Sequence, residues 1–222
     1  MQPIKHYENK FTGDTCVVIG NGPSLKDIDL PRLSVKYPTF GSNRIYLYPF
    51  VPKFYAIADP VMVASCLLDI QKPNFVPDAM FLSRSVPLKG AYLINYAVKW
   101  GFSKNPQHEL VIGGTVTYVL LQLAYWMGFK KVLLVGIDHS YPGAASHGVP
   151  GTPFIQEGDD KDHFSPDYFK PGMVYNRPEL EATEKYYRLA KSVFEADGRK
   201  IINLSTKTNL LVYDRHNVKN YY

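Results

Sequence analysis

Six short apolar runs alternate along the chain with stretches of helical character. The runs cover residues 16–20, 39–43, 54–58, 79–83, 131–137 and 200–204. A strand that is apolar at consecutive positions is buried on both faces, which is typical of parallel sheets. The pattern therefore predicts a mostly parallel sheet.

Four segments between these runs are predicted to be helices: residues 24–33, 60–70, 115–127 and 178–196. The third is apolar almost all round, and Gly128 follows it as a C-cap. The fourth carries an apolar stripe at helical spacing and ends before Gly198. This alternation predicts the α/β class with right-handed crossovers.

Two stretches do not fit the alternation. Residues 87–108 are expected to be helical at best in their middle. Residues 140–175 form a segment of 36 residues rich in Gly, Pro, Asp and His. Such a long irregular stretch inside a compact domain is usually functional, so we expect it to be a mobile lid that is ordered only with ligand.

The composition narrows the class of protein. The chain has 222 residues, which favours a single domain over 1–222, and its 25 Lys and Arg against 20 Asp and Glu give a net charge of +5. That charge fits an anionic ligand or an ordinary surface, and the scattered basic residues argue against a nucleic-acid partner.

No apolar run reaches the ~18 residues of a membrane span, and the first residues lack the apolar core of a secretory signal. We expect a cytoplasmic protein in which Cys16 and Cys66 are buried thiols rather than a disulfide.

The first candidate site follows the first predicted strand. Gly20 and Gly22 allow a tight turn and close approach of a ligand, and Ser24 can cap a following helix whose N-terminus suits a phosphate. A third glycine and a Gly-Lys-Ser/Thr sequence are both missing, so the turn is neither the dinucleotide fingerprint nor a Walker A loop. A simple strand–turn–helix connection without ligand explains the pattern equally well.

Three further candidates follow the other strands or precede a helix. Asn43 can bind a ribose or base edge, or form an Asx turn. Gly113, Gly114 and Thr115 form a second glycine turn before an apolar helix, and so a second candidate anion site. Asp138, followed by His139, comes after the clearest strand, where it either takes part in the chemistry or braces neighbouring loops.

The segment 140–175 contains a dense group of carboxylates around one histidine. Asp159, Asp160 and Asp162 precede His163, and such a group either binds a divalent cation or is a solvated loop. The chain has no zinc pattern and no Gly-x-Ser-x-Gly elbow. We therefore expect no resident metal and no serine hydrolase chemistry.

Several of these stretches resemble the bacterial sialyltransferases of glycosyltransferase family 42. The resemblance rests on three segments: the stretch Val-Ile-Gly-Asn-Gly-Pro-Ser-Leu that ends at Leu25, residues 42–46, and the block from Gly113 through the apolar helix to Gly-Ile-Asp at 136–138. The closing part, from His163 to Asn203, is more similar to domain of unknown function 115, a group that includes 6-hydroxymethylpterin pyrophosphokinase-like proteins. Together these stretches cover about half of the chain.

The resemblance implies a single Rossmann-like domain with a lid over a nucleotide site. It assigns nucleotide contacts to Asn21, Gly22, Asn43 and Thr115. It also implies metal-independent catalysis, with a lid histidine as general base and tyrosines at the departing phosphate. Tyr141 is the matching tyrosine, although it follows Gly-Ile-Asp one residue late. The base is His163, or Asp167 at the position where the family has its histidine, or neither.

Three functions are compatible with these observations. The first is a glycosyltransferase-like enzyme that uses a nucleotide-activated sugar, of the CMP-nonulosonate type, and a glycan or small-molecule acceptor, without a cofactor. The second is a pyrophosphokinase acting on a pterin-like alcohol, which would require Mg²⁺. The third is a nucleotide-binding module without turnover. The sequence is compatible with a homo-oligomer under each of them.

Overall fold

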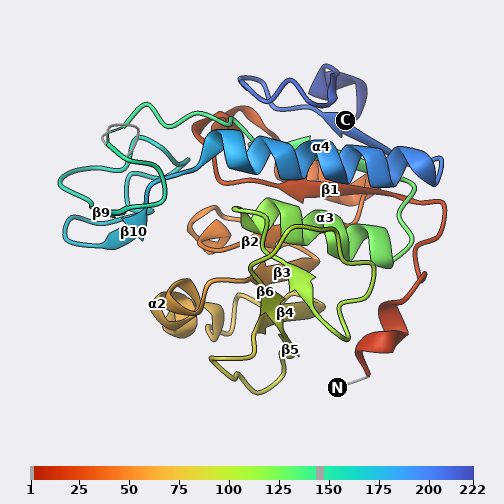
Figure 1. Ribbon diagram of the computed structural model, residues 1–222, viewed down its shortest axis with the longest axis horizontal. Helices are drawn as coiled ribbons and strands as arrows, with labels where there is room; N and C mark the ends of the chain where they lie inside the picture. The colour runs from red at the N-terminus through yellow and green to blue at the C-terminus, as the bar shows by residue number, and fades with distance from the viewer. Residues whose placement is uncertain (1–2, 144–147) are drawn as a thin grey trace.

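A parallel sheet forms the centre of the computed structural model, which describes residues 3–143 and 148–222 (Figure 1). The sheet has eight strands in the order β12-β11-β8-β1-β2-β3-β4-β5, and every neighbouring pair is parallel. The strands are β1 (Thr15–Ile19), β2 (Thr39–Ser42), β3 (Phe54–Ile57), β4 (Ala79–Ser83), β5 (Tyr92–Ile94), β8 (Lys131–Val135), β11 (Lys200–Asn203) and β12 (Asp214–Arg215). The predicted parallel sheet is confirmed.

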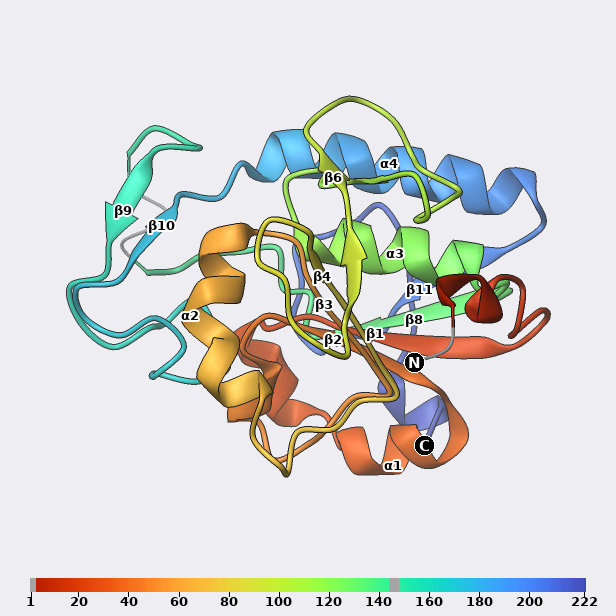
Figure 2. The same ribbon diagram turned by 90° about the horizontal axis from the view of Figure 1, so that it is seen from below.

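Helices cover both faces of this sheet, as Figure 2 shows. One face carries α3 (Val116–Trp126) and α4 (Leu180–Ala196), and the other carries α1 (Leu30–Lys36) and α2 (Pro60–Ile70). Successive residues of β1 alternate between the two layers: Cys16 and Val18 pack under α3, and Val17 and Ile19 pack on the α1 side. The fold is therefore a three-layer, Rossmann-like α/β arrangement, as expected.

The segment predicted as a helix over residues 24–33 is divided in two. A 3-10 helix covers Pro23–Asp27, Ile28 is extended, and α1 starts only at Leu30. The carboxylate of Asp29 accepts a hydrogen bond from the Arg32 N–H at 3.0 Å and caps the new helix, which has Pro31 in its first turn. The single helix was a wrong prediction because this cap and proline restart the helix.

Residues 87–108 contain no helix, contrary to the expectation for their middle. They contribute β5, at the edge of the sheet, and β6 (Tyr96–Ala97), which pairs in parallel with β7 (Leu110–Val111). Aromatic and β-branched residues dominate β5 and β6, and such side chains favour strands. The short length of both strands hid them in the sequence pattern.

The predicted lid, residues 140–175, has two parts in the structure; residues 144–147 lie outside the described part of the chain. One part carries the antiparallel pair β9 (Pro153–Ile155) and β10 (Val174–Asn176), which lies at one end of the molecule in both views (Figures 1 and 2). The other part packs Phe164, Tyr168 and Phe169 into the core on the α1 side of the sheet. The segment is thus fastened to the body at its centre.

Two further expectations concern the chain as a whole. Cys16 and Cys66 are free and buried, as predicted. Within the described residues, every helix is too short or too polar to span a bilayer. Short 3-10 helices complete the described chain at Ile4–Tyr7, Ile45–Leu47 and Val218–Asn220.

Candidate functional site

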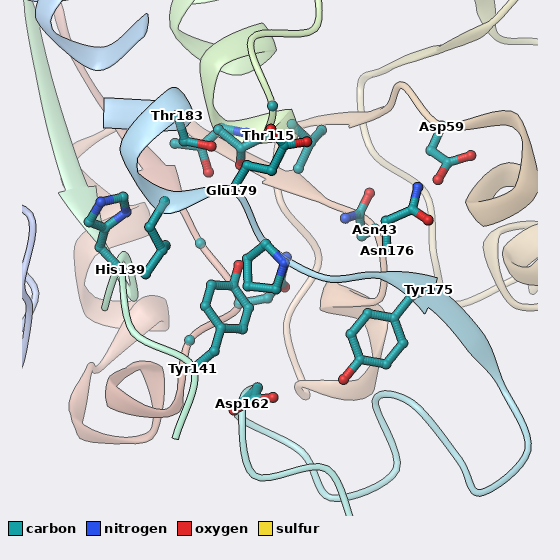
Figure 3. A pocket seen from close by; sticks show the side chains of 18 of the residues that line it. Asn43, Asp59, Thr115, His139, Tyr141, Asp162, Tyr175, Asn176, Glu179 and Thr183 are labelled. Carbon is teal, nitrogen blue, oxygen red and sulfur yellow. Dashed lines mark hydrogen bonds between the residues drawn. The ribbon is translucent and has the colours of Figure 1, made fainter. Parts of the chain in front are cut away.

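A cavity of about 660 Å³ opens where β1 and β8 end (Figure 3). These neighbouring strands form the switch point of the sheet, because the chain continues from β1 toward β5 and from β8 toward β12. Ligands of open parallel sheets bind in the crevice at such a point. The cavity walls come from residues 20–22, 43, 58–60, 62, 98, 112–117, 136–141, 151, 162–163, 168–169, 175–180, 183 and 186–187.

The glycine turn after β1 lies in this cavity, as the sequence predicted, but its glycines serve the packing of the chain. The Gly22 N–H donates to the carbonyl of Gly136 at 2.9 Å. A Cβ on Gly20 would lie 2.4 Å from the Gly136 carbonyl oxygen, and one on Gly22 would lie 2.6 Å from Oδ1 of Asp138. Close approach of the β1 and β8 ends therefore requires both glycines.

Asp138 holds this turn in place. Its carboxylate accepts hydrogen bonds from the Ser24 N–H at 2.8 Å and from the Ser24 hydroxyl. Burial raises the pKa of Asp138, and the two bonds from Ser24 oppose that rise. Ser24 is buried against Asp138 and does not line the cavity. The predicted cap was wrong: Ser24 lies inside the 3-10 helix, whose N-cap residue is Gly22, and its hydroxyl donates to Asp138. Of the two readings of Asp138, the structure supports the brace, although the residue also borders the cavity.

The two candidate asparagines line the same cavity. The Asn21 amide nitrogen donates to the carbonyl and hydroxyl of Ser42 at 3.4 and 3.3 Å. Its Oδ1 is buried and finds no hydrogen-bond partner among the described residues. Asn43 adopts a left-handed φ of 49°, as an Asx turn allows, and Figure 3 shows it grouped with Asn176 and Asp59. An acceptor left open at the end of β1 is a position for a ligand donor.

The second glycine turn also lies in the cavity, at the N-terminus of α3. Gly113 and Gly114 have φ values of 59° and 75°, which L side chains rarely adopt. Thr115 caps α3 by accepting a hydrogen bond from the Thr117 N–H at 3.3 Å. The N-terminus of α3 therefore faces the cavity, where its free N–H groups suit an anion.

Tyrosines form much of the remaining wall. Burial, with help from the carboxylates of Asp162 and Asp160, raises the pKa of Tyr141 to about 12. Its phenol consequently keeps its proton near neutral pH and can donate a hydrogen bond. The expected tyrosine is thus in the cavity despite its one-residue displacement.

His163 reaches the cavity, and Asp167 does not. His163 lines the wall with its Nδ1 2.8 Å from Oδ2 of Asp160, and its ring is stacked on Tyr168 with centroids 3.9 Å apart. Asp167 is exposed outside the cavity, and its N–H donates to the Ser165 hydroxyl at 3.3 Å. Of the two candidate bases, only the histidine is placed to touch a ligand in this cavity.

The carboxylates near His163 do not converge. Asp159 is exposed and Asp160 is buried, whereas Asp162 borders the cavity and accepts a hydrogen bond from the Gly143 N–H at 2.6 Å. Burial raises the pKa of Asp162. In the part of the chain that the structure describes, no group of three His, Cys, Asp or Glu side chains is arranged to hold a metal ion.

Other lining residues were missed or read as structural in the sequence. Asp59, which follows β3 and precedes Pro60 as an N-cap residue should, caps α2 with its carboxylate 2.8 Å from the Val61 N–H, and it also borders the cavity. His139, noted only for its place after β8, lines it with a left-handed φ of 51° and a pKa that burial lowers. The missed lining side chains include Tyr175, Asn176, Glu179, Thr183 and Tyr187. They lie at the end of the lid and the start of α4, where the sequence shows no motif.

Comparison with known proteins adds information on the fold. No protein-family model matches the chain, and no similar sequence is found among curated proteins. Among solved structures, the MAf glycosyltransferase from Magnetospirillum magneticum AMB-1 superposes with a TM-score of 0.60 at 15% identity, over 94% of this chain and 34% of that one. This chain thus spans about a third of that protein.

Two sialyltransferases from Campylobacter jejuni also superpose. CstII, in complex with cytidine-5′-monophosphate, gives a TM-score of 0.53 at 15% identity over 92% of this chain and 85% of that one. The monofunctional alpha-2,3-sialyltransferase Cst-I gives a TM-score of 0.52 at 17% identity, over 91% of this chain and 79% of that one. At these identities the likeness concerns the fold, so the chain shares the fold of these bacterial glycosyltransferase structures.

Proposed function

We propose that this protein is a glycosyltransferase that uses a nucleotide-activated sugar as donor. The donor class is a CMP-linked nonulosonate, and the acceptor is a hydroxyl of a glycan or small molecule. The shared fold with glycosyltransferase structures, one of which holds cytidine-5′-monophosphate, supports the class. The donor class rests additionally on the sequence resemblance to family 42.

One observation carries the proposal: the switch-point cavity combines an open acceptor on Asn21 with a histidine on its wall. The first feature suits recognition of a nucleotide, and the second suits removal of a proton. The nucleotide contacts Asn21 and Asn43 in this proposal, and its phosphate lies near the N-terminus of α3 at Thr115.

The transfer step then follows from the wall residues. The acceptor oxygen attacks the anomeric carbon, and its proton passes to His163. The bond from that carbon to the phosphate oxygen breaks, and the phosphate departs with the electron pair. The Tyr141 phenol, which is protonated near neutral pH, donates a hydrogen bond to the departing phosphate. Residues 140–175 limit the access of water, which would otherwise hydrolyse the donor.

Donor hydrolysis and transfer assays test this proposal. CMP-N-acetylneuraminic acid, UDP-glucose and GDP-mannose are each incubated with the protein and an acceptor panel, with and without EDTA. We expect release of CMP that EDTA does not abolish. Mg²⁺-dependent diphosphate transfer from ATP to 6-hydroxymethylpterin would instead support the pyrophosphokinase, and nucleotide binding without turnover would support a binding module.

A variant pair links this activity to the proposed base. His163→Ala should lower turnover by roughly 10²–10⁴-fold, the usual range for a lost general base, with little change in nucleotide affinity. His108→Ala, an exposed histidine outside the cavity, is the matched control. Normal turnover in His163→Ala combined with its loss in Asp167→Ala would assign the role to the aspartate.

A further inference from the structure

The carboxylate of Asp160 is fully buried in the lid segment. Its Oδ1 accepts hydrogen bonds from the backbone N–H groups of Asp162 at 2.7 Å and His163 at 3.1 Å. Its Oδ2 accepts one from the Phe169 N–H at 3.2 Å. A buried carboxylate is tolerated where such bonds replace its hydration. These three bonds fix the carboxylate relative to the backbone on both sides of His163.

The fourth bond to this carboxylate involves the His163 ring. Nδ1 of His163 lies 2.8 Å from Oδ2 of Asp160, the same oxygen that accepts from Phe169. The stacked Tyr168 ring is parallel to the imidazole within 1°, and the Phe169 ring meets it edge-on with centroids 5.3 Å apart. A rotation of the imidazole would break the bond and the stack together. Nε2 is the ring nitrogen left for a ligand of the cavity that His163 lines.

We propose that Asp160 is a positioning residue that holds neutral His163 in the tautomer with the proton on Nδ1. Because the carboxylate accepts, Nδ1 donates, and Nε2 carries the free electron pair. In the transfer reaction, which rests on the proposed function, Nε2 takes the proton of the acceptor hydroxyl. The Asp160 carboxylate continues to accept the hydrogen bond from Nδ1 and so stabilises the imidazolium that forms when Nε2 takes the proton.

The other groups around the ring do not offer the same partner. Asp162 accepts from the Gly143 N–H, and its carboxylate belongs to the cavity wall. Tyr141 lies edge-on to the imidazole with centroids 6.2 Å apart, and Tyr175 donates its hydroxyl to Gln156 at 3.1 Å. Both phenols have raised pKa values and are neutral near pH 7. Asp160 is therefore the group that selects the tautomer.

Nitrogen-15 NMR of histidine-labelled protein tests this assignment directly. In the wild-type protein without ligand, at a pH where the ring is neutral, we expect the His163 signals of a protonated Nδ1 and an unprotonated Nε2. His163→Gln identifies the signals by their loss. A wild-type His163 with the proton on Nε2, or with both tautomers equally populated, would overturn the proposal.

Asp160→Asn tests the consequence for turnover. An asparagine has one acceptor oxygen, so keeping the Asp162 and His163 N–H bonds turns its NH₂ toward Nδ1, and the proton moves to Nε2. We expect the opposite tautomer and a fall in turnover of roughly 10²–10⁴-fold at unchanged affinity for CMP. Asp159→Asn, at the exposed neighbouring position, should change neither the tautomer of His163 nor turnover. An Asp160→Asn protein that folds and keeps the wild-type tautomer or turnover contradicts the inference.

The two proposals fail separately. If His163 has the expected tautomer and no nucleotide sugar is turned over, the glycosyltransferase assignment fails and the positioning role of Asp160 stands. If sugar transfer occurs while His163 carries its proton on Nε2, the inference on Asp160 fails and the function stands.

Discussion

Buried polar side chains around the cavity differ in whether their hydrogen bonds are complete. Asp138 and Asp160 are satisfied by neighbouring donors, and both therefore organise the site from within. Asn21 Oδ1 is left open among the described residues, although the amide of the same side chain is bonded to Ser42. Since an unpaired buried acceptor is unfavourable, its position at the cavity indicates where a ligand would compensate for it.

Replacing Asn21 should weaken nucleotide binding. Asn21→Ala removes the open acceptor, so a nucleotide donor group would be buried without a partner, at about 1–3 kcal/mol of binding free energy. Calorimetric titration with CMP measures this change. Asn74→Ala, at an exposed position, is the control. An unchanged affinity in Asn21→Ala would place the nucleotide elsewhere.

His139 should make stability depend on pH in the mildly acidic range. Burial lowers its pKa below the usual 6.5, and the nearby Glu184 opposes this in part. As pH falls through about 6.5, the unfolded chain therefore takes up a proton that the folded protein does not, and the free energy of unfolding decreases.

A pair of variants isolates this contribution. His139→Asn removes the titrating ring, and asparagine tolerates the left-handed φ of this position. Urea unfolding at several pH values below 6.5 should show a shallower loss of stability in this variant than in the wild type. Exposed His108→Asn should keep the wild-type slope. Equal slopes in all three proteins would contradict the burial effect.

At the scale of elements, the ends of β1 and β8 determine the shape of the cavity floor. Their glycines allow two strand ends and two following turns to meet, with the Gly20 N–H 2.8 Å from the Val135 carbonyl. The two glycines of this turn are therefore explained by packing alone. The sequence Gly-Asn-Gly by itself does not indicate that a ligand binds there.

Gly20→Ala should destabilise the fold before any ligand is considered. Its Cβ would lie 2.4 Å from a backbone oxygen and 2.2 Å from Cδ1 of Ile137, so the strand ends must separate. We expect a loss of about 1–3 kcal/mol in the free energy of unfolding, typical of overpacking. Gly158→Ala, where a Cβ meets no atom within 4 Å, should be near neutral. Denaturant unfolding measures the free energy of unfolding of both variants, and equal values for the two would contradict this prediction.

The lid segment should be the first region that trypsin cuts. Lys161 is exposed next to the buried Asp162 and Phe164, and the β9–β10 pair lies at the end of the molecule (Figure 1). CMP should slow cleavage after Lys161, because a ligand in the cavity contacts the lid wall. Mass spectrometry of early fragments identifies the sites. First cuts elsewhere, with residues 140–175 intact in the free protein, would contradict the lid.

At the scale of the whole molecule, the site belongs to no single part of the chain. The walls of the cavity come from segments between residues 20 and 187, carried by both helical layers and by the lid. The two apolar cores on the faces of the sheet share β1 and β8. Binding at the cavity should therefore stabilise the protein as one unit.

Unfolding should consequently be a single cooperative transition. Far-UV circular dichroism reports the sheet and helices, and tryptophan fluorescence reports exposed Trp100 and buried Trp126. We expect the two probes to give the same urea transition. CMP at about 100 times its Kd should raise the free energy of unfolding by about 2.7 kcal/mol. Two separate transitions would show that residues 1–222 are more than one cooperative unit.

Much of the fold was predictable because strands buried on both faces have a distinctive pattern. The run 131–137 corresponds to β8, and α2 begins at Pro60 and ends at Ile70 as predicted. The division of residues 24–33 was not predicted, because the cap at Asp29 competes with continuous helix. The short strands β5 to β7 escaped detection because each has only two or three residues, too few for a strand pattern to show.

The sequence by itself determined the α/β class, the six longer strands of the sheet and the glycine turns, since each depends on residues close together in the chain. The tertiary structure decided which candidates share the cavity. It turned Ser24 toward Asp138, left Asp167 on the surface and buried Asp160 beside His163. Those outcomes depend on packing between segments more than a hundred residues apart and on how the lid folds back on the sheet, and a local pattern holds no information on either.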